Sequence, residues 1–278
     1  MGLEIALMWC AVGAYALGSI LFIVGVVFGR SAIVRWALVV STIGLVMHSV
    51  AIAERWVRAG HAPYLGFYEV VSAYALATVA VFLVIAWARP GLRSLGVVLM
   101  PLALLALGAA LFADKSSELV TGALSSWWLA VHVTFAKLSY ASFVVAFALA
   151  VVYLVRERPG TGGRAREVLD KLPSQETLDS LSFKFIGVGT LFLAVMIGAG
   201  AIWANEAWGR YWAWDPIETW SLITWLVYAL YLHLRLTMGW QGRRAAWFAA
   251  CAMLVVVFSF VAVPVVYNSI HGAYLQGF

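Results

Sequence analysis

Apolar segments long enough to cross a lipid bilayer recur along the whole chain of 278 residues. A helix needs roughly 20 apolar residues to span the hydrocarbon core, and only helices and closed barrels satisfy their backbone hydrogen bonds there. The segments are residues 5–28, 36–53, 70–88, 95–113, 127–155, 185–204, 217–234 and 245–266. The pattern predicts an all-α, polytopic membrane helix bundle with eight transmembrane helices, forming a single integral-membrane domain over residues 1–278.

Composition supports the membrane class and disfavours several others. Hydrophobic residues make up 64% of the chain and charged residues 11%, which is more apolar surface than a soluble single domain can bury. The formal charge of +5 is small and spread over the loops, so we expect no nucleic-acid partner. Cys10 and Cys251 are far apart and form no C-x-x-C-H motif, so the chain is not itself a c-type cytochrome.

The distribution of basic residues predicts the orientation. Thirteen of the 18 Lys and Arg residues fall on one side of the eight segments, and cytoplasmic loops are enriched in these residues. Both termini are therefore expected on the outer, extracytoplasmic side. Residues 156–184 form the one sizeable loop on the basic side and are predicted to be a cytoplasmic connector. Its second half, with Leu178, Leu181 and Phe185 at helical spacing, is expected to form a short interfacial helix.

Six of the 14 tryptophans lie within residues 203–225, around the predicted outer link between two spans. One or two tryptophans at a span end are typical of the membrane interface. Six, interleaved with charged residues such as Arg210 and Asp215, indicate a platform for a large, flat, apolar ligand with polar edges. We expect an external, ligand-handling segment over residues 203–218. Its candidate binding residues are Trp203, Trp208, Arg210, Trp212, Trp214, Asp215 and Trp220.

The run from Trp208 to Pro216, WGRYWAWDP, resembles the tryptophan-rich "WWD" signature of haem-handling proteins of cytochrome c assembly. Its continuation to His233 is most similar to the CcsA (ResC) family of system II. One departure is Ile217, where that family usually carries Lys. The resemblance implies a membrane complex, built with a CcsB (ResB)-like partner, that exports haem b and attaches it to the CxxCH motif of apocytochrome c. The chain would be the haem-delivery and presentation subunit of this cytochrome c synthase, or haem lyase, in a bacterial inner or thylakoid-type membrane.

Haem iron takes two axial ligands on opposite faces, so candidate histidines must lie at the same depth. His132 precedes Lys137, whose charge places this part of the fifth segment near the outer surface, and His271 follows the eighth segment on the same side. We predict that His132 and His271 are the axial ligands of an external haem. His233 lies near the inner end of the seventh segment, too far in depth from His48 to share an iron. It is a candidate for a second haem whose other ligand comes from another chain.

Arg55, Arg58 and Arg210 are the basic residues on the outer side that could bind the haem propionates. His48 and His61 are expected to pair with Glu54 or Glu69, or to shape the cavity, and not to bind iron. Two other functions remain open from the residues alone. One is a HemX-like membrane regulator of tetrapyrrole synthesis, which would act on a soluble enzyme through the connector. The other is a transporter that binds no haem.

Overall fold

The computed structural model describes residues 2–113, 125–157, 163 and 168–270, and this part of the chain contains helices and no strand. Cys10 and Cys251 are both free thiols. The helices are α1 (Gly2–Val27), α2 (Ser31–Ala59), α3 (Gly66–Ala88), η1 (Pro90–Leu95), α4 (Gly96–Phe112), α5 (Trp127–Arg156), α7 (Gln175–Trp208), α8 (Pro216–Thr237), α9 (Arg243–Val257), the π-helical turn η3 (Phe258–Ala262) and α10 (Val263–Val266).

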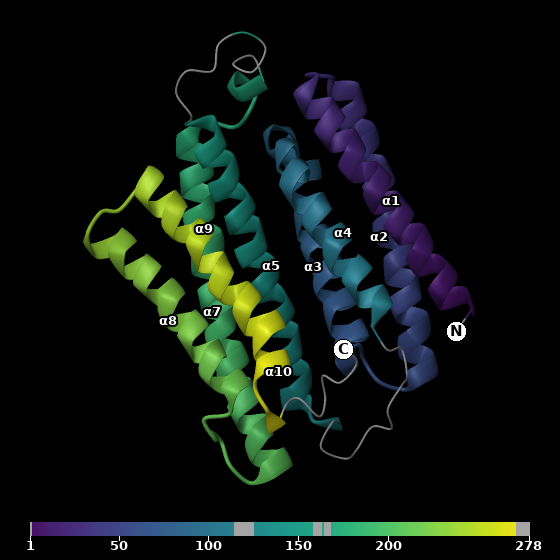
Figure 1. The fold of residues 1–278 in the computed structure, drawn as a ribbon, viewed down its shortest axis with the longest axis vertical. Coiled ribbons are helices and arrows are strands. Elements are labelled where there is room, and N and C mark those ends of the chain that lie inside the picture. The colour runs from purple at the N-terminus through teal and green to yellow at the C-terminus, as the bar shows by residue number, and fades with distance from the viewer. Residues whose placement is uncertain (1, 114–124, 158–162, 164–167, 271–278) are drawn as a thin grey trace.

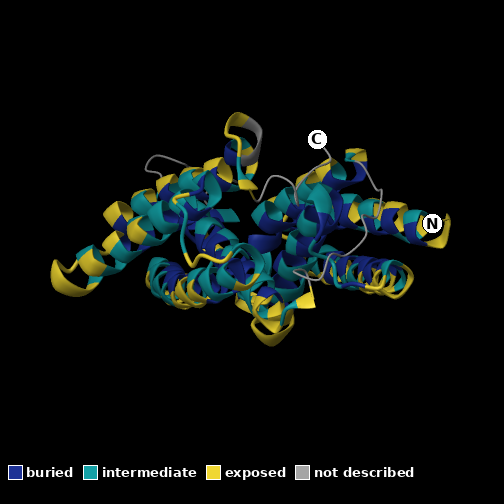
Figure 2. Ribbon diagram, turned by 90° about the horizontal axis from the view of Figure 1, so that it is seen from below, coloured by how far each residue is buried: buried dark blue, intermediate teal, exposed yellow. Residues whose placement is uncertain are grey.

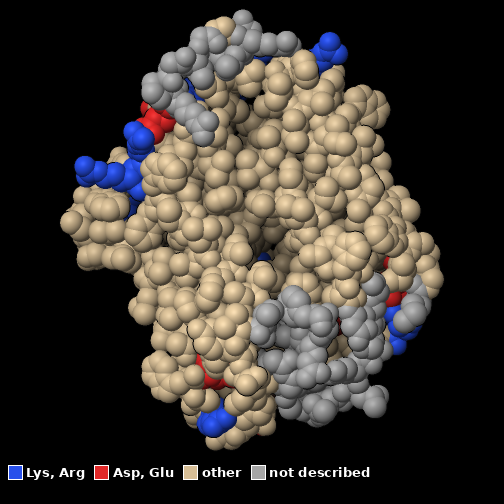
Figure 3. All heavy atoms as spheres, in the orientation of Figure 1, with Lys and Arg blue, Asp and Glu red and all other residues tan. Residues whose placement is uncertain are grey.

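Seven helical segments within the described ranges are long and apolar enough to cross a membrane: α1, α2, α3, η1 with α4, α5, α7, and α9 with η3. They coincide with seven of the eight predicted segments. The remaining one, 217–234, is the helix α8, which is richer in Trp and Tyr and carries Glu218 in its first turn and Arg235 in its last. Figure 3 shows almost all visible charged side chains near the two ends of the molecule, with a broad band of other residues between them. The chain is therefore a polytopic helical membrane protein.

The helices form two groups that meet along α3 and α5 (Figure 1). In the first group α1 packs on α2 and α3 packs on α4, and in the second α5 packs on α7, with α8 and α9 beside them. Small residues allow the close pairs, since a Cβ atom at Gly44 of α2 would lie 2.8 Å from a ring carbon of Tyr15 on α1. Buried residues lie along the contacts between helices and exposed residues face outward (Figure 2).

Two boundaries differ from the sequence predictions. The interfacial helix expected before the sixth span is not separate, because α7 runs without a break from Gln175 to Trp208. The side chain of Ser174 caps its start by accepting a hydrogen bond from the Thr177 N–H at 3.2 Å. The last ten residues of the predicted connector, 156–184, thus belong to α7, and residues 158–162 and 164–167 lie outside the described part.

The predicted external segment, 203–218, is mostly helix. Helix α7 extends to Trp208 and ends at Gly209, whose φ of 72° is the left-handed conformation that glycine adopts readily. Helix α8 begins at Pro216. Only residues 209–215 form a loop, at the same end of the bundle as the start of α1 and α10 (Figure 1).

Candidate ligand cavity at the end of the bundle

A cavity of about 170 Å³ opens beside this loop, between α3, α5, α7, α8 and η3. Its lining is largely aromatic and aliphatic, with His132, Glu218, Ser221 and Ser259 among its polar residues. Ligand pockets for drug-sized molecules have volumes of about 300–1,000 Å³. A larger ligand therefore enters this cavity with one edge only, unless the loop beside it moves.

His132 extends into the lining from the second turn of α5. Its Nδ1 lies 2.9 Å from the carbonyl oxygen of Met196 on α7. Because a carbonyl only accepts, Nδ1 carries the proton, and the neutral imidazole then has its lone pair on Nε2. A hydrogen bond to a backbone carbonyl commonly fixes this tautomer in metal-binding histidines. The His132 ring also stacks against Trp203, with centroids 6.5 Å apart.

Gly200 has no side chain, and this leaves room for the imidazole of His132. A Cβ atom at this position of α7 would lie 2.5 Å from the Nδ1 atom of His132. The absence of a side chain therefore allows α5 and α7 to approach closely enough for the hydrogen bond to Met196. Sequence reasoning did not identify Gly200, because only the helix pairing places it opposite His132.

The tryptophans of the signature occupy three different environments. Trp203 and Trp212 line the cavity. Trp208 packs edge-on against Trp203 at 5.0 Å, and Trp220 packs on Phe258 at 4.5 Å. Trp214 is 69% exposed and stands perpendicular to Trp212, with ring centroids 5.8 Å apart. The rings therefore surround the cavity and its rim and do not form one flat surface.

Trp212 contributes a buried polar atom to the cavity wall. Its indole Nε1 is buried in the cavity wall and has no hydrogen-bond acceptor among the described residues. Leaving a buried donor unsatisfied costs about 1–3 kcal/mol, so such groups in native structures need an explanation. An acceptor on a bound ligand would satisfy this N–H.

The D-P-x-E part of the signature is a helix-capping element. Asp215 is the N-cap of α8, where its carboxylate accepts from the Ile217 N–H at 3.0 Å, and Pro216 occupies the first helical position. Glu218 completes the capping box, accepting from the N–H of Asp215 at 3.2 Å and from that of Ala213 at 2.9 Å. Trp214 has a φ of 57°, the only positive value at a non-glycine among the described residues. The two carboxylates thus hold the tryptophan loop in a conformation that is unusual for its sequence.

Asp215 also binds the C-terminal segment. Its Oδ1 accepts from the Ser269 hydroxyl and its Oδ2 from the Ile270 N–H, both at 2.7 Å. His271 itself lies outside the described residues, so its position stays a prediction. Asp215 nevertheless holds the residue before it beside the tryptophan loop, a role that no local pattern in the sequence indicates.

The other predicted residues are placed as follows. Arg210 is exposed in the loop, whereas Arg55 and Arg58 are paired with glutamates. Ile217 lines the cavity. His48 is fully buried, with Nε2 2.9 Å from the Ser72 hydroxyl and Nδ1 3.3 Å from that of Tyr15. His233 lies on the exposed face of α8.

The fold and the site together define a class, namely a polytopic helical membrane protein with an aromatic, histidine-containing cavity at one end of its bundle. The chain belongs to the cytochrome c assembly protein family, whose model matches residues 64–271. Curated relatives named cytochrome c biogenesis protein CcsA are 38% identical over 226 residues in Chlamydomonas reinhardtii and 37% identical over 265 residues in Synechococcus sp. (strain CC9605). These matches cover 78% and 83% of this chain, and 62% and 87% of the relatives. The chain is thus a member of the CcsA family, as the tryptophan signature predicts.

A solved structure has a similar fold. The cytochrome c haem lyase CcmF matches with a TM-score of 0.62 at 18% sequence identity. The match covers 98% of this chain and 47% of CcmF. At this level of identity the likeness concerns the fold, and it shows that nearly the whole chain forms one architecture.

Proposed function

We propose that this chain is the haem-delivery and presentation subunit of a CcsA-type cytochrome c synthase, which exports haem b and attaches it to the CxxCH motifs of apocytochrome c. The observation that carries the proposal is the geometry of His132. Its Nδ1–H donates to the Met196 carbonyl, so Nε2 carries the lone pair and is the nitrogen that would bind iron in this aromatic cavity. Membership of the CcsA family supports the same function.

His132 and His271 are the two axial ligands in this proposal. The hydrogen bond from Ile270 to Asp215 supports it, because it holds the residue before His271 at the tryptophan loop that borders the cavity. Trp203 and Trp212 contact one edge of the porphyrin, and the exposed Trp214 extends the apolar surface at the rim. Arg210 is the exposed base of the loop that is available to a propionate.

The remaining expectations concern the membrane. Helix α8 is proposed as an eighth span, which places both termini and the cavity on the outer side, in a bacterial inner or thylakoid-type membrane.

The exposed position of His233 on α8 is compatible with an iron ligand that meets a second ligand from a CcsB-like partner. His233→Ala should then lower the amount of haem that reaches the outer site and leave the absorption spectrum of that site unchanged.

The decisive experiment is an absorption spectrum of the full chain, purified from membranes and reduced. A low-spin, bis-imidazole haem is expected in the wild type, with a loss of that signature in His132→Gly. His48→Gln is a control, because its ring is bound to Tyr15 and Ser72, outside the cavity lining. A wild-type protein that contains no haem when isolated, and binds none when haem is added, would contradict the proposal.

The HemX-like alternative finds no support in the relatives described above. It predicts that a soluble enzyme binds the 156–184 connector and that cytochrome maturation continues without the chain. Deleting the gene and measuring covalent haem in the periplasmic cytochromes separates the two functions. Loss of covalent haem with normal total haem supports the synthase subunit.

A further inference from the structure

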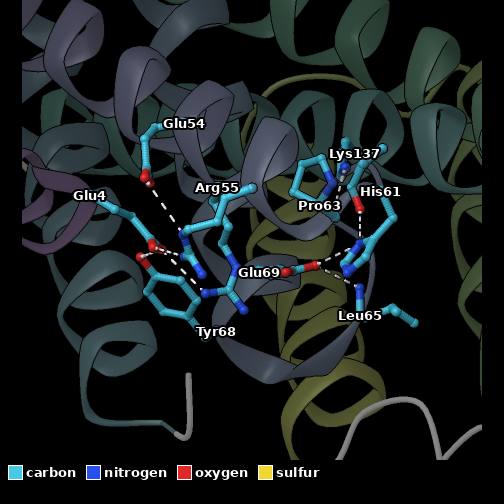
Figure 4. Close-up of polar contacts among 11 residues, drawn as sticks. Glu4, Glu54, Arg55, His61, Pro63, Leu65, Tyr68, Glu69 and Lys137 are labelled. Atoms are coloured by element: carbon cyan, nitrogen blue, oxygen red, sulfur yellow. Dashed lines mark hydrogen bonds and ion pairs between the residues drawn. The ribbon is translucent and has the colours of Figure 1, made fainter. Parts of the chain in front are cut away.

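A buried cluster of charged side chains lies beside the cavity and has no part in the proposed haem site (Figure 4). It draws on α1, α2, α3 and α5, and its three carboxylates and three cations balance in charge. The members are Glu4, Glu54, Glu69, Arg55, Arg58 and Lys137. Glu4, Arg55 and Glu69 are each less than 5% exposed. An ionisable cluster in a membrane protein is costly to bury and is usually functional.

Glu69 holds a short loop from the side of α3. Its Oε1 accepts from Arg55 Nε at 2.6 Å, and its Oε2 accepts from the Leu65 N–H at 3.0 Å. The same oxygen lies 3.7 Å from Nδ1 of His61, which in turn donates to the carbonyl of Ala62 at 2.9 Å. Glu69 therefore contacts both ends of the loop formed by residues 61–65.

Lys137 holds the same loop from the side of α5. Its Nζ donates to the carbonyl oxygen of Pro63 at 3.0 Å, and its charge attracts that of Glu69. Figure 4 shows Lys137 and Glu69 reaching the loop from different helices. Within the loop, the Tyr64 N–H donates to the Ala62 carbonyl at 2.9 Å.

The loop forms a wall of the cavity. Tyr64 and Leu65 both line it, and Leu65 packs with Leu129 and Trp203 in one buried cluster. Trp203 is the ring that stacks against His132. A continuous path of contacts therefore leads from the two charged side chains, through Leu65 and Trp203, to the proposed iron ligand.

We propose that Glu69 and Lys137 are positioning residues for the haem cavity: they fix the 61–65 loop from two helices and thereby set the packing of Trp203 against His132. This inference rests on the proposed function. Neither residue touches haem. They act by keeping the cavity wall in one conformation, so that little ordering of the loop is required when the ligand binds.

The test compares Lys137→Met with Lys137→Arg in the full chain purified from membranes. Lys137→Met removes the donor to Pro63 and should lower the haem-to-protein ratio several-fold and change the electron paramagnetic resonance g values of the remaining haem. Lys137→Arg keeps a donor and should restore both. The matched control is Arg58→Met, which removes a cation of the same cluster whose contacts are Glu4 and Glu54 and not the loop. A general effect of charge loss would change the control equally and would overturn the inference.

Two further measurements keep the inference separate from folding and from the proposed function. If Lys137→Met does not accumulate in the membrane, Leu65→Ala takes its place in the test. Leu65→Ala leaves the charged cluster intact and should reproduce the spectral change. Hydrogen exchange at the amides of Tyr64 and Leu65 needs no haem, and Lys137→Met should accelerate it at least tenfold while Arg58→Met does not. A haem-free wild type with this exchange pattern would contradict the proposed function alone. Unchanged exchange and unchanged spectra in Lys137→Met would overturn the positioning role alone.

Discussion

The carboxylate of Asp215 accepts a hydrogen bond from the backbone N–H of Ile270 at 2.7 Å, across 55 residues of sequence. The same side chain caps α8. One residue of the tryptophan signature therefore has two structural tasks, which are to begin a helix and to hold the chain that leads to His271. The two tasks have different consequences when the carboxylate is removed.

Asp215→Ala should lose both contacts, whereas Asp215→Asn keeps an acceptor for the helix cap but weakens the pair of bonds to Ser269 and Ile270. Loss of an N-cap costs about 0.5–2 kcal/mol, so we expect Asp215→Ala to lower thermal stability and Asp215→Asn to change it little. Both variants should lower the haem-to-protein ratio. Retention of haem in Asp215→Asn would show that the tether is not needed for the site.

His132→Gly and His271→Gly should each lose cytochrome maturation and regain part of it when imidazole is added to the culture, because free imidazole occupies the vacant axial position. Trp212→Ala and Trp214→Ala should lose haem without such rescue, since imidazole replaces a ligand and not an aromatic contact. Covalent haem in the product cytochrome is the readout. Equal rescue of both classes would contradict the assignment of the ligands.

Gly200→Ala should displace His132, because the new Cβ atom would lie 2.5 Å from Nδ1 and interfere with the bond to Met196. Overpacking of this kind costs about 1–3 kcal/mol, so haem affinity should fall by about fivefold or more. Gly198→Ala on the same helix is the matched control, since a Cβ there meets no atom within 4 Å. Haem titration of both variants measures the difference. Equal affinities would show that Gly200 does not set the position of the imidazole.

Arg55→Met should destabilise the protein strongly. Arg55 is 4% exposed and bridges Glu4 to Glu69, and removing one partner of a buried ion pair costs about 3–5 kcal/mol. Arg58→Met should cost less, because the Arg58 side chain is 32% exposed and solvent screens its pairs. Thermal unfolding in detergent compares the two. A larger loss in Arg58→Met would contradict this reading of the cluster.

Local features of the sequence determined where the helices lie and were sufficient to identify the family. Hydropathy alone predicted the seven helical segments that are long and apolar enough to cross a membrane to within a few residues at most ends, since a run of apolar residues is sufficient to define a helix in lipid. The capping box at Asp215 and Glu218 is equally local and explains why part of the signature has its spacing. The exposed Trp214 and the cavity-lining His132 were recognisable as candidates because their residue types and their place in the chain already suggested a ligand site.

Tertiary structure decided which of these residues meet. Nothing in the sequence pairs Glu4 with Arg55, His132 with Met196, or Asp215 with Ile270, because each contact depends on the rotation of two helices about their axes and on the way they pack. The same packing buries Trp203 and leaves Trp214 exposed, although both belong to one tryptophan-rich segment. Hydropathy and capping act within a few residues of the chain, whereas the cavity is formed by side chains from α3, α5, α7, α8 and η3, and the mutual orientation of these helices is a property of the whole bundle.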